Sequence, residues 1–321
     1  MVKSLQLQAE MTEEFGVCVF DVTLDCEDGA PVGGEEEQAH RVCALANAAQ
    51  AATNSIADAP LRRVGVRLHA VDHAAFEADA EIVVGGAARA LSYVMIPKVE
   101  FRADVDRAVA AVDAACRVAG HAAPLPLHVL IESPAAVHRA HDIAAHPRVQ
   151  SLSFGLMDFV SAHAGAIPSA AMGLRPLDDH HTLDQFHHPL VVRAKMEIAS
   201  AAHAYGKVPS HCVVTELRDA ARTEHAARTA ATALGYTRMW SIHPDQIRPI
   251  VRAFTPATEE VELAADIVLQ AARQEWAPIV VQGKLHDRAS FRYFWQVLER
   301  AHQTGCVLPE PVRVYFPTRV H

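Results

Sequence analysis

The sequence predicts an α/β fold, a (β/α)8 TIM barrel with a C-terminal helical extension. Short apolar runs alternate with Ala-rich helical patterns through most of the chain, as repeated strand–helix units require. Several of the runs are almost continuously apolar, which is typical of parallel strands covered on both faces. No G-x-G-x-x-G motif follows the first predicted strand, and this disfavours the alternative of an open doubly wound sheet.

The predicted strands and helices alternate from the first residues onward. The first strand, residues 4–8, lies so close to the second that only a short helix fits between them. Helix-start signals follow two later strands, at Ser133-Pro134 and at His243-Pro244. Strands are predicted at residues 4–8, 17–25, 64–69, 93–98, 127–132, 151–155, 207–215 and 238–243. Helices are predicted at residues 36–52, 73–89, 102–119, 135–145, 189–205, 217–234 and 245–253.

The chain is predicted to divide after residue 254. Residues 1–254 carry the alternation and should form the barrel with its catalytic mouth, the end at which the strands finish. Residues 255–321 contain two further helical patterns, at 255–276 and 289–301, and should form a C-terminal helical extension or lid. The connection at 156–188 is too long for an ordinary loop and is expected to be functional or mobile.

Composition excludes several classes of protein. The chain of 321 residues has a net charge of −9 without a block of Lys or Arg, so no nucleic-acid partner is expected. No apolar run is long enough to span a membrane, and the polar first residues do not resemble a signal peptide. The six cysteines form no C-x-x-C pair and are expected to be reduced thiols. The cytoplasm is therefore the predicted location.

Charged residues gather where the predicted strands end, and in a barrel these ends meet at one mouth. Converging carboxylates repel one another unless a cation lies among them, and oxygen ligands favour Mg²⁺ or Mn²⁺ over zinc. We take Glu132 and Asp158, on neighbouring strands, as the metal ligands. The structural alternatives are a helix cap for Asp158 and a salt bridge for Glu132. The charged residues are Glu27, Asp28, Arg67, Lys98, Glu132 and Asp158.

Arg67 lies inside an otherwise apolar strand, where a guanidinium needs anionic partners. Its planar fork suits a substrate carboxylate, and pairing with Glu27 or Asp28 is the alternative. Arg67 can serve in both ways, binding substrate and pairing with an acid, if Glu27 orients Arg67 while Asp28 supports the metal site. Lys98 either joins this group or pairs with Glu100.

Six short motifs occur in one order along the chain and together resemble the HpcH/HpaI aldolase family, with its citrate lyase β-subunit-like and malyl-CoA lyase-like members. Residues 25–28 resemble the family's D-L-E-D, residues 66–69 its V-R-I-N and residues 96–100 its L-P-K-V-E. Residues 130–134 resemble L-I-E-T-P, residues 153–158 A-F-G-x-E-D and residues 241–244 A-I-H-P. Any one of these motifs is a weak signal, but six in order are a strong one.

The resemblance implies a barrel in which Glu132 and Asp158 bind Mg²⁺ while Arg67 and Gly155 contact a 2-oxo acid. It also implies a homotrimer or homohexamer. Residues 283–287 are similar to a G-K-M-I-D segment that closes over a neighbouring subunit's site and supplies an Asp, so Asp287 is a candidate catalytic residue. The alternative for Asp287 is a helix N-cap.

The predicted function is that of a Mg²⁺-dependent lyase that cleaves a 3-hydroxyacyl-CoA, such as malyl-, citramalyl- or citryl-CoA, into a 2-oxo acid and an acyl-CoA. Departures from the family pattern concern coenzyme A and the substrate: the first segment lacks the family's Arg and Pro-Gly loop, Met157 replaces a Glu, and His211 replaces an Asp. Two alternatives therefore stay open. One is a class II aldolase acting on free 4-hydroxy-2-oxo acids without coenzyme A, and the other is a non-catalytic barrel subunit or binding protein.

Overall fold

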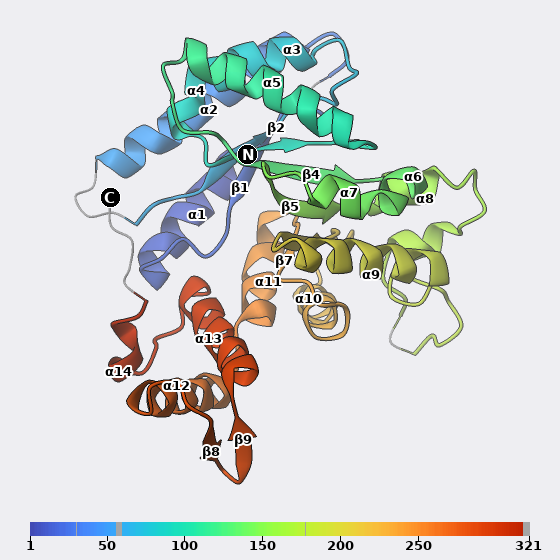
Figure 1. Ribbon diagram of the computed structural model, residues 1–321. Helices are drawn as coiled ribbons and strands as arrows, with labels where there is room; N and C mark the ends of the chain where they lie inside the picture. The colour runs from blue at the N-terminus through green and yellow to red at the C-terminus, as the bar shows by residue number, and fades with distance from the viewer. Residues whose placement is uncertain (30, 56–59, 177, 317–321) are drawn as a thin grey trace.

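The computed structural model describes residues 1–29, 31–55, 60–176 and 178–316 and shows an α/β fold with one curled parallel sheet. Seven strands lie side by side in their order along the chain, and helices lie between them in sequence and cover the outside of the sheet (Figure 1). The strands are β1 (Val22–Asp25), β2 (Val64–Arg67), β3 (Tyr93–Ile96), β4 (Leu127–Ile131), β5 (Val149–Phe154), β6 (Val208–His211) and β7 (Arg238–Met239). This arrangement is TIM-barrel-like.

The predicted first strand is wrong, because residues 4–8 belong to helix α1 (Val2–Phe15), which is also longer than the short helix expected after it. Leu5, Gln8, Met11 and Thr12 are buried at helical spacing. The Gln8 amide donates to the carbonyls of Phe20 (3.0 Å) and Arg63 (2.7 Å). Leu and Gln alternate over five residues only, and a helix accommodates so short an alternation equally well.

The described residues thus contain seven strands in the sheet and not the eight of the predicted closed barrel. A side-chain bridge links the two edge strands. Asp21 lies just before β1 and pairs with Arg238 of β7 at 2.7 Å and with Arg63 at 2.5 Å. The two guanidiniums outweigh the effect of burial and lower the pKa of the Asp21 carboxyl. An ion-pair cluster therefore lies where a closed barrel would have a further strand.

Strand register determines which side chains enter the barrel. Asp25 of β1 lies beside Arg67 of β2, and paired residues in parallel strands point to the same face. On this inner face Thr23 bonds to the Tyr93 hydroxyl at 2.6 Å, and Tyr93 stacks on His128. The alternate residues, Leu24, Val66, Val94, Val129 and Leu152, belong to the apolar core with the helices. Because all strands run in parallel, their carboxyl ends open together at the mouth.

The helices follow the predicted pattern, but two of them are divided. The helix predicted at 135–145 is split at Arg139. The predicted helix at 73–89 is broken into α3 (Phe76–Asp79), the π-helix η1 (Ala80–Val84), α4 (Gly85–Ala87) and the 3-10 turn η2 (Ala88–Ala90). The other barrel helices are α2 (Glu35–Asn54), α5 (Arg102–Val118), α6 (Pro134–His138), α7 (Ala140–Ala144), α8 (Leu156–Ser161), η3 (Ser169–Met172), α9 (Pro189–Ala204), α10 (Ala220–Leu234), η4 (Pro244–Gln246) and α11 (Ile247–Phe254). None of the helices in the described ranges is long and apolar enough to cross a membrane.

The C-terminal elements pack on one another below the barrel in Figure 1. They are α12 (Thr258–Arg273), the antiparallel hairpin of β8 (Ile279–Val281) and β9 (Lys284–His286), α13 (Arg288–Gln303) and α14 (Glu310–Arg313). Their apolar side chains form clusters separate from the barrel core, such as Val268 with Leu298 and Ile279 with Phe291. Residues 317–321 of the predicted extension lie outside the described residues. The division after residue 254 stays a prediction.

Candidate active site

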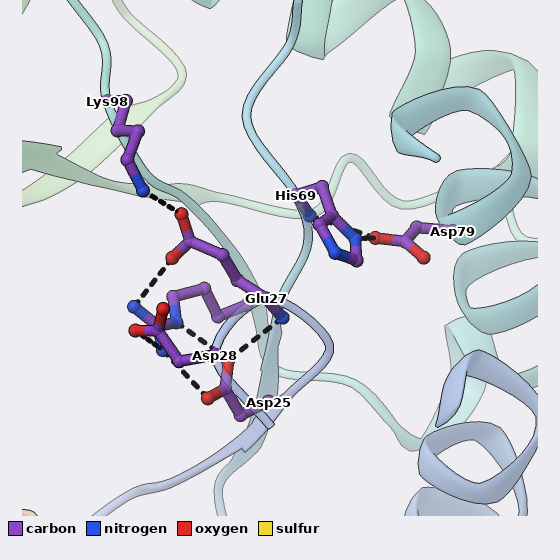
Figure 2. A network of polar contacts seen from close by, with 7 residues as sticks. Asp25, Glu27, Asp28, His69, Asp79 and Lys98 are labelled. Carbon is purple, nitrogen blue, oxygen red and sulfur yellow. Dashed lines mark hydrogen bonds and ion pairs between the residues drawn. The ribbon is translucent and has the colours of Figure 1, made fainter. Parts of the chain in front are cut away.

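Arg67, the last residue of β2, contacts three carboxylates at the mouth. Figure 2 shows these acids, Asp25, Glu27 and Asp28, close to one another. Register places Asp25 beside Arg67, so the guanidinium Nε and Nη2 donate to the two Asp25 oxygens at 2.7 Å each. Nη1 lies 2.7 Å from Glu27 Oε2, and Nη2 lies 2.8 Å from Asp28 Oδ2. Burial opposes the charge of Arg67, but the bonds and charges of these carboxylates prevail and raise its pKa.

The contacts of Arg67 confirm the pairing with Glu27 and Asp28 that its sequence position suggested. Asp25 was not singled out in advance, although it opens the D-C-E-D motif and makes the bidentate contact. Asp28 is the most exposed of the three partners, with 75% of its side-chain surface accessible. Trp240 completes the surroundings, since the Arg67 guanidinium lies 5.4 Å from the centre of its ring.

Lys98 follows β3 and pairs with Glu27, not with Glu100. Its φ of 53° is left-handed, a conformation that is strained for a residue with a side chain and that clusters at functional sites. Glu27 therefore bridges two cations, Arg67 and Lys98. Burial lowers the pKa of Lys98, but the bond to Glu27 and the charges of Glu27, Glu132 and Asp158 raise it more.

Glu132 and Asp158 follow neighbouring strands, Glu132 directly after β4 and Asp158 in the first turn of α8. Glu132 is only 6% exposed, and its Oε2 has no hydrogen-bond partner among the described residues. Burial, followed by the negative charges of Asp158 and Glu27, raises the pKa of Glu132 to about 7, although Lys98 and Arg67 oppose this. The carboxyl is thus held in a place where its negative charge is only partly balanced.

This arrangement fits a hard divalent cation. A buried carboxyl with a free oxygen beside a second, exposed carboxylate gives two oxygen ligands, and Mg²⁺ commonly takes few protein ligands and keeps several waters. Neither structural alternative is present in the part of the chain described: Asp158 does not cap α8, and Glu132 forms no salt bridge. Among all the residues that the structure describes, no group of three or more His, Cys, Asp or Glu has metal-binding geometry.

Gly155 lies directly against Glu132. A Cβ added at residue 155 would lie 2.4 Å from Glu132 Cγ and 2.6 Å from its Oε1, so only glycine leaves room for the carboxyl. Gly155 also separates β5 from α8, the helix that carries Asp158. The predicted contact of Gly155 with substrate stays a prediction, while its packing explains why this position needs glycine.

Asp287 caps helix α13 in the C-terminal extension. Its Oδ1 accepts from the backbone N–H of Ala289 at 3.0 Å, and its own N–H donates to Ser290 Oγ at 3.0 Å. The structural alternative is therefore realised in this chain, and a catalytic role for Asp287 stays a prediction. His211 faces away from the barrel interior. It is fully buried and stacks on Phe186.

Sequence reasoning missed a second polar pair beside the mouth. His69 follows β2, and both its backbone N–H and its Nδ1 bond to Oδ2 of Asp79, at 2.9 Å and 2.7 Å (Figure 2). A cavity of about 400 Å³ is lined by His69 together with Glu27 and Lys98. One sequence feature could have indicated this pair: His69 occupies the position at which the V-R-I-N motif has Asn.

Comparison with known proteins gives one consistent result. The family model for HpcH/HpaI aldolase/citrate lyase matches residues 4–244. An L-malyl-CoA/β-methylmalyl-CoA lyase of Cereibacter sphaeroides is 31% identical over 248 residues, covering 74% of this chain and 76% of that protein. A crystal structure of a citrate lyase from Burkholderia xenovorans is 45% identical with a TM-score of 0.77, covering 98% of this chain and 91% of that one. The crystal structure of the CitE protein of Mycobacterium tuberculosis, in complex with magnesium, acetoacetate and coenzyme A, is 25% identical with a TM-score of 0.59. The match covers 93% of this chain and 95% of that one.

Proposed function

The chain belongs to the HpcH/HpaI aldolase/citrate lyase family, and from this premise we propose that it is a Mg²⁺-dependent carbon–carbon lyase acting on a 3-hydroxyacyl-CoA. The products are a 2-oxo acid and an acyl-CoA, and malyl-, citramalyl- and citryl-CoA are the candidate substrates. One observation carries the proposal: the buried Glu132 carboxyl has a free oxygen beside Asp158, in the same mouth as Arg67. Relatives named for malyl-CoA cleavage and the magnesium and coenzyme A of the Mycobacterium tuberculosis complex support it.

Glu132 and Asp158 are the residues that would hold the cation. Bound Mg²⁺ supplies Lewis-acid stabilisation of the negative charge that develops on the substrate oxygen during cleavage. Binding the cation also relieves the repulsion between the two carboxylates, which lie in the mouth with Glu27. Lys98 balances the remaining negative charge through its pair with Glu27.

Arg67 is the residue that binds the carboxylate of the substrate. Asp25 and Glu27 hold the guanidinium from two sides, so its orientation is fixed before substrate arrives. Asp28 is the exposed partner, and a substrate carboxylate can replace it on Nη2 without exposing a buried charge. This exchange orients the carbon–carbon bond for cleavage.

Cleavage breaks the bond between the hydroxyl-bearing carbon and the α-carbon of the thioester. The hydroxyl loses its proton, its carbon becomes the carbonyl carbon of the 2-oxo acid, and the electron pair of the broken bond moves into the thioester as an enolate. The α-carbon then takes one proton, so one proton is lost and one is gained. The chain must therefore present a proton donor near the thioester.

One observation favours a second candidate, an aldolase acting on free 4-hydroxy-2-oxo acids without coenzyme A. Residues 1–40 contain no arginine, and helix α1 occupies the segment that precedes β1. The arginine that the family pattern would place near the phosphates of coenzyme A is therefore missing from this segment. The non-catalytic subunit is the remaining alternative.

A substrate panel tests the proposal. Malyl-, citramalyl- and citryl-CoA and free 4-hydroxy-2-oxo acids are incubated with the protein, with and without Mg²⁺, and the released 2-oxo acid is measured. We expect cleavage of at least one thioester with Mg²⁺ and none after chelation. Cleavage of the free acids alone would show that the protein is a class II aldolase. The absence of any cleavage would favour the non-catalytic subunit or binding protein.

Four further features belong to the proposal. They are assembly as a homotrimer or homohexamer, a cytoplasmic location, the division into a barrel at 1–254 and an extension at 255–321, and participation of Asp287 in a neighbouring subunit's site. The six cysteines are free thiols in the structure, which accords with a reducing compartment.

A further inference from the structure

We propose that His69, positioned by Asp79, is the acid–base residue of this reaction. It donates the proton that the α-carbon of the thioester enolate takes after cleavage, and it removes the same proton in the reverse condensation. The inference rests on the proposed lyase activity. It assigns a catalytic role to a side chain that stands where the family motif has Asn.

The contacts of His69 determine which ring nitrogen is available. Asp79 Oδ2 accepts from the backbone N–H of His69, so it is an acceptor for Nδ1 as well, and Nδ1 carries a proton. Nε2 lies on the other side of the ring, and no described residue bonds to it. Carboxylates commonly fix the tautomer of a functional imidazole in this way.

The ring of His69 is also held in one orientation. The side chains of His69 and Asp79 are 6% and 1% exposed. His73 stacks on the ring, with centroids 4.4 Å apart and planes inclined by 13°. A fixed ring suits proton transfer, because the donor need not be reorganised during the reaction.

The cavity places His69 beside the mouth. Glu27 and Lys98 line this cavity with His69, and Glu27 also contacts Arg67. The charges of Glu132 and Asp158 also act on Lys98. A substrate whose carboxylate is bound by Arg67 can therefore extend its thioester along Glu27 and Lys98 toward Nε2.

The other ionisable groups around His69 are less suitable donors. Asp79 on α3 is occupied by His69, and Glu27 and Asp28 after β1 are paired with Arg67. Lys98 after β3 is paired with Glu27, which raises its pKa and makes it a weaker acid. Glu35 at the start of α2 accepts from the backbone of Gly33. The remaining lining groups are Asp72 and His73, in the loop after β2.

The proton balance of the step is simple. The Nε2–H bond of the imidazolium breaks, the enolate electron pair forms the new C–H bond at the α-carbon, and the thioester carbonyl is restored. His69 becomes neutral and regains a proton from water, while the proton of the substrate hydroxyl leaves to water. In condensation neutral Nε2 accepts the α-proton.

The test compares the pH profile of thioester cleavage in the wild-type protein with that of His69→Asn and Asp79→Asn. We expect His69→Asn to lower kcat by about 100-fold or more and to remove one limb of the profile. Asp79→Asn should lower kcat by a smaller factor and should shift the same limb of the pH profile to a different pH. Titration with Mn²⁺ should give wild-type values in both variants. Circular dichroism should show both variants folded at the assay temperature, with a melting temperature lowered by the loss of a buried bond. His40→Asn, at an exposed histidine of α2 outside the cavity, is the matched control and should cleave within about threefold of wild type.

Each other outcome is decisive. An unchanged pH profile in His69→Asn would overturn the assignment, and so would a loss of activity that only parallels a loss of Mn²⁺ affinity. If Asp287→Asn, and not His69→Asn, removed this limb of the pH profile, the role of proton donor would belong to Asp287. If His69→Asn does not fold, His69→Gln, which retains an amide to donate to Asp79, gives the same comparison. A wild-type protein that cleaves no thioester would overturn the proposed function together with this inference.

Discussion

Glu132 and Gly155 are packed so closely that a Cβ at residue 155 would overlap the Glu132 side chain, 2.4 Å from Cγ. Glu132 has little room to move, because it is 6% exposed and its surroundings are the barrel wall and the other charged residues of the mouth. The absence of a side chain at residue 155 thus fixes where the carboxyl of residue 132 lies. This connects a backbone feature of the β5–α8 turn to the proposed cation site.

Gly155→Ala is therefore expected to displace Glu132 and to weaken Mg²⁺ binding by about tenfold or more, since ligand positions tolerate little change. Isothermal titration with Mg²⁺ measures the effect. Gly85→Ala is the control: an added Cβ there meets nothing within 4 Å, and the helical position should tolerate or favour alanine. Equal Mg²⁺ affinity in Gly155→Ala and wild type would mean that the packing does not position a ligand.

Arg67→Lys is expected to lower kcat/KM for the thioester by about 100-fold, mainly through a higher KM. A lysine cannot keep the two bonds to Asp25 together with those to Glu27 and Asp28. Steady-state kinetics with the substrate found in the panel measure this loss. Asp28→Asn, at the exposed partner, should change kcat/KM by no more than about threefold. A similar loss in both variants would contradict the proposed exchange of Asp28 for substrate.

Lys195 gives a prediction about stability and pH. Its side chain is fully buried, where Nζ donates to Gln185 Oε1 at 2.9 Å and lies 4.1 Å from the Phe186 ring centre. Burial lowers the pKa of Lys195 from 10.5 to about 8. Between these two pH values the unfolded chain binds more protons than the folded one, so the free energy of unfolding should rise with pH from about 8 to about 10.5.

Lys195→Met should remove this rise and raise the free energy of unfolding at pH 7 by about 1–3 kcal/mol, because no buried charge remains. Urea unfolding at pH 7 and pH 10 measures both effects. Lys3→Met is the control, since Lys3 lies near the start of α1 and is exposed. An unfolding free energy that still rises between these pH values in Lys195→Met would assign the titration to another group.

The sequence predicted most of the fold because several of the expected strands are almost continuously apolar, which is typical of parallel strands covered on both faces. The strand predicted at residues 4–8 was wrong because a brief Leu–Gln alternation suits a strand or a helix equally well. The burial of side chains along α1 decides between the two. The break of the helix at 73–89 also went unpredicted. Gly86 packs there against Cys43 of α2, a contact between segments far apart in sequence.

The candidate site was predicted to a similar extent. A guanidinium within an apolar strand requires acids, so the partners of Arg67 could be inferred without coordinates. The bidentate bond to Asp25 depends on the register between β1 and β2, which residue types do not reveal. The bond between His69 and Asp79 joins a strand end to a short helix, where an acid normally faces solvent. The free oxygen of Glu132 likewise depends on three-dimensional packing.

The most direct measurement is calorimetric titration of Mg²⁺ into the wild-type protein and into Glu132→Gln and Asp158→Asn, with the exposed Glu81→Gln as control. We expect one binding site in the wild type and the control, and an affinity lower by about 100-fold or more in each of the other two variants. Wild-type affinity in either Glu132→Gln or Asp158→Asn would contradict the claim that these two carboxylates hold the cation.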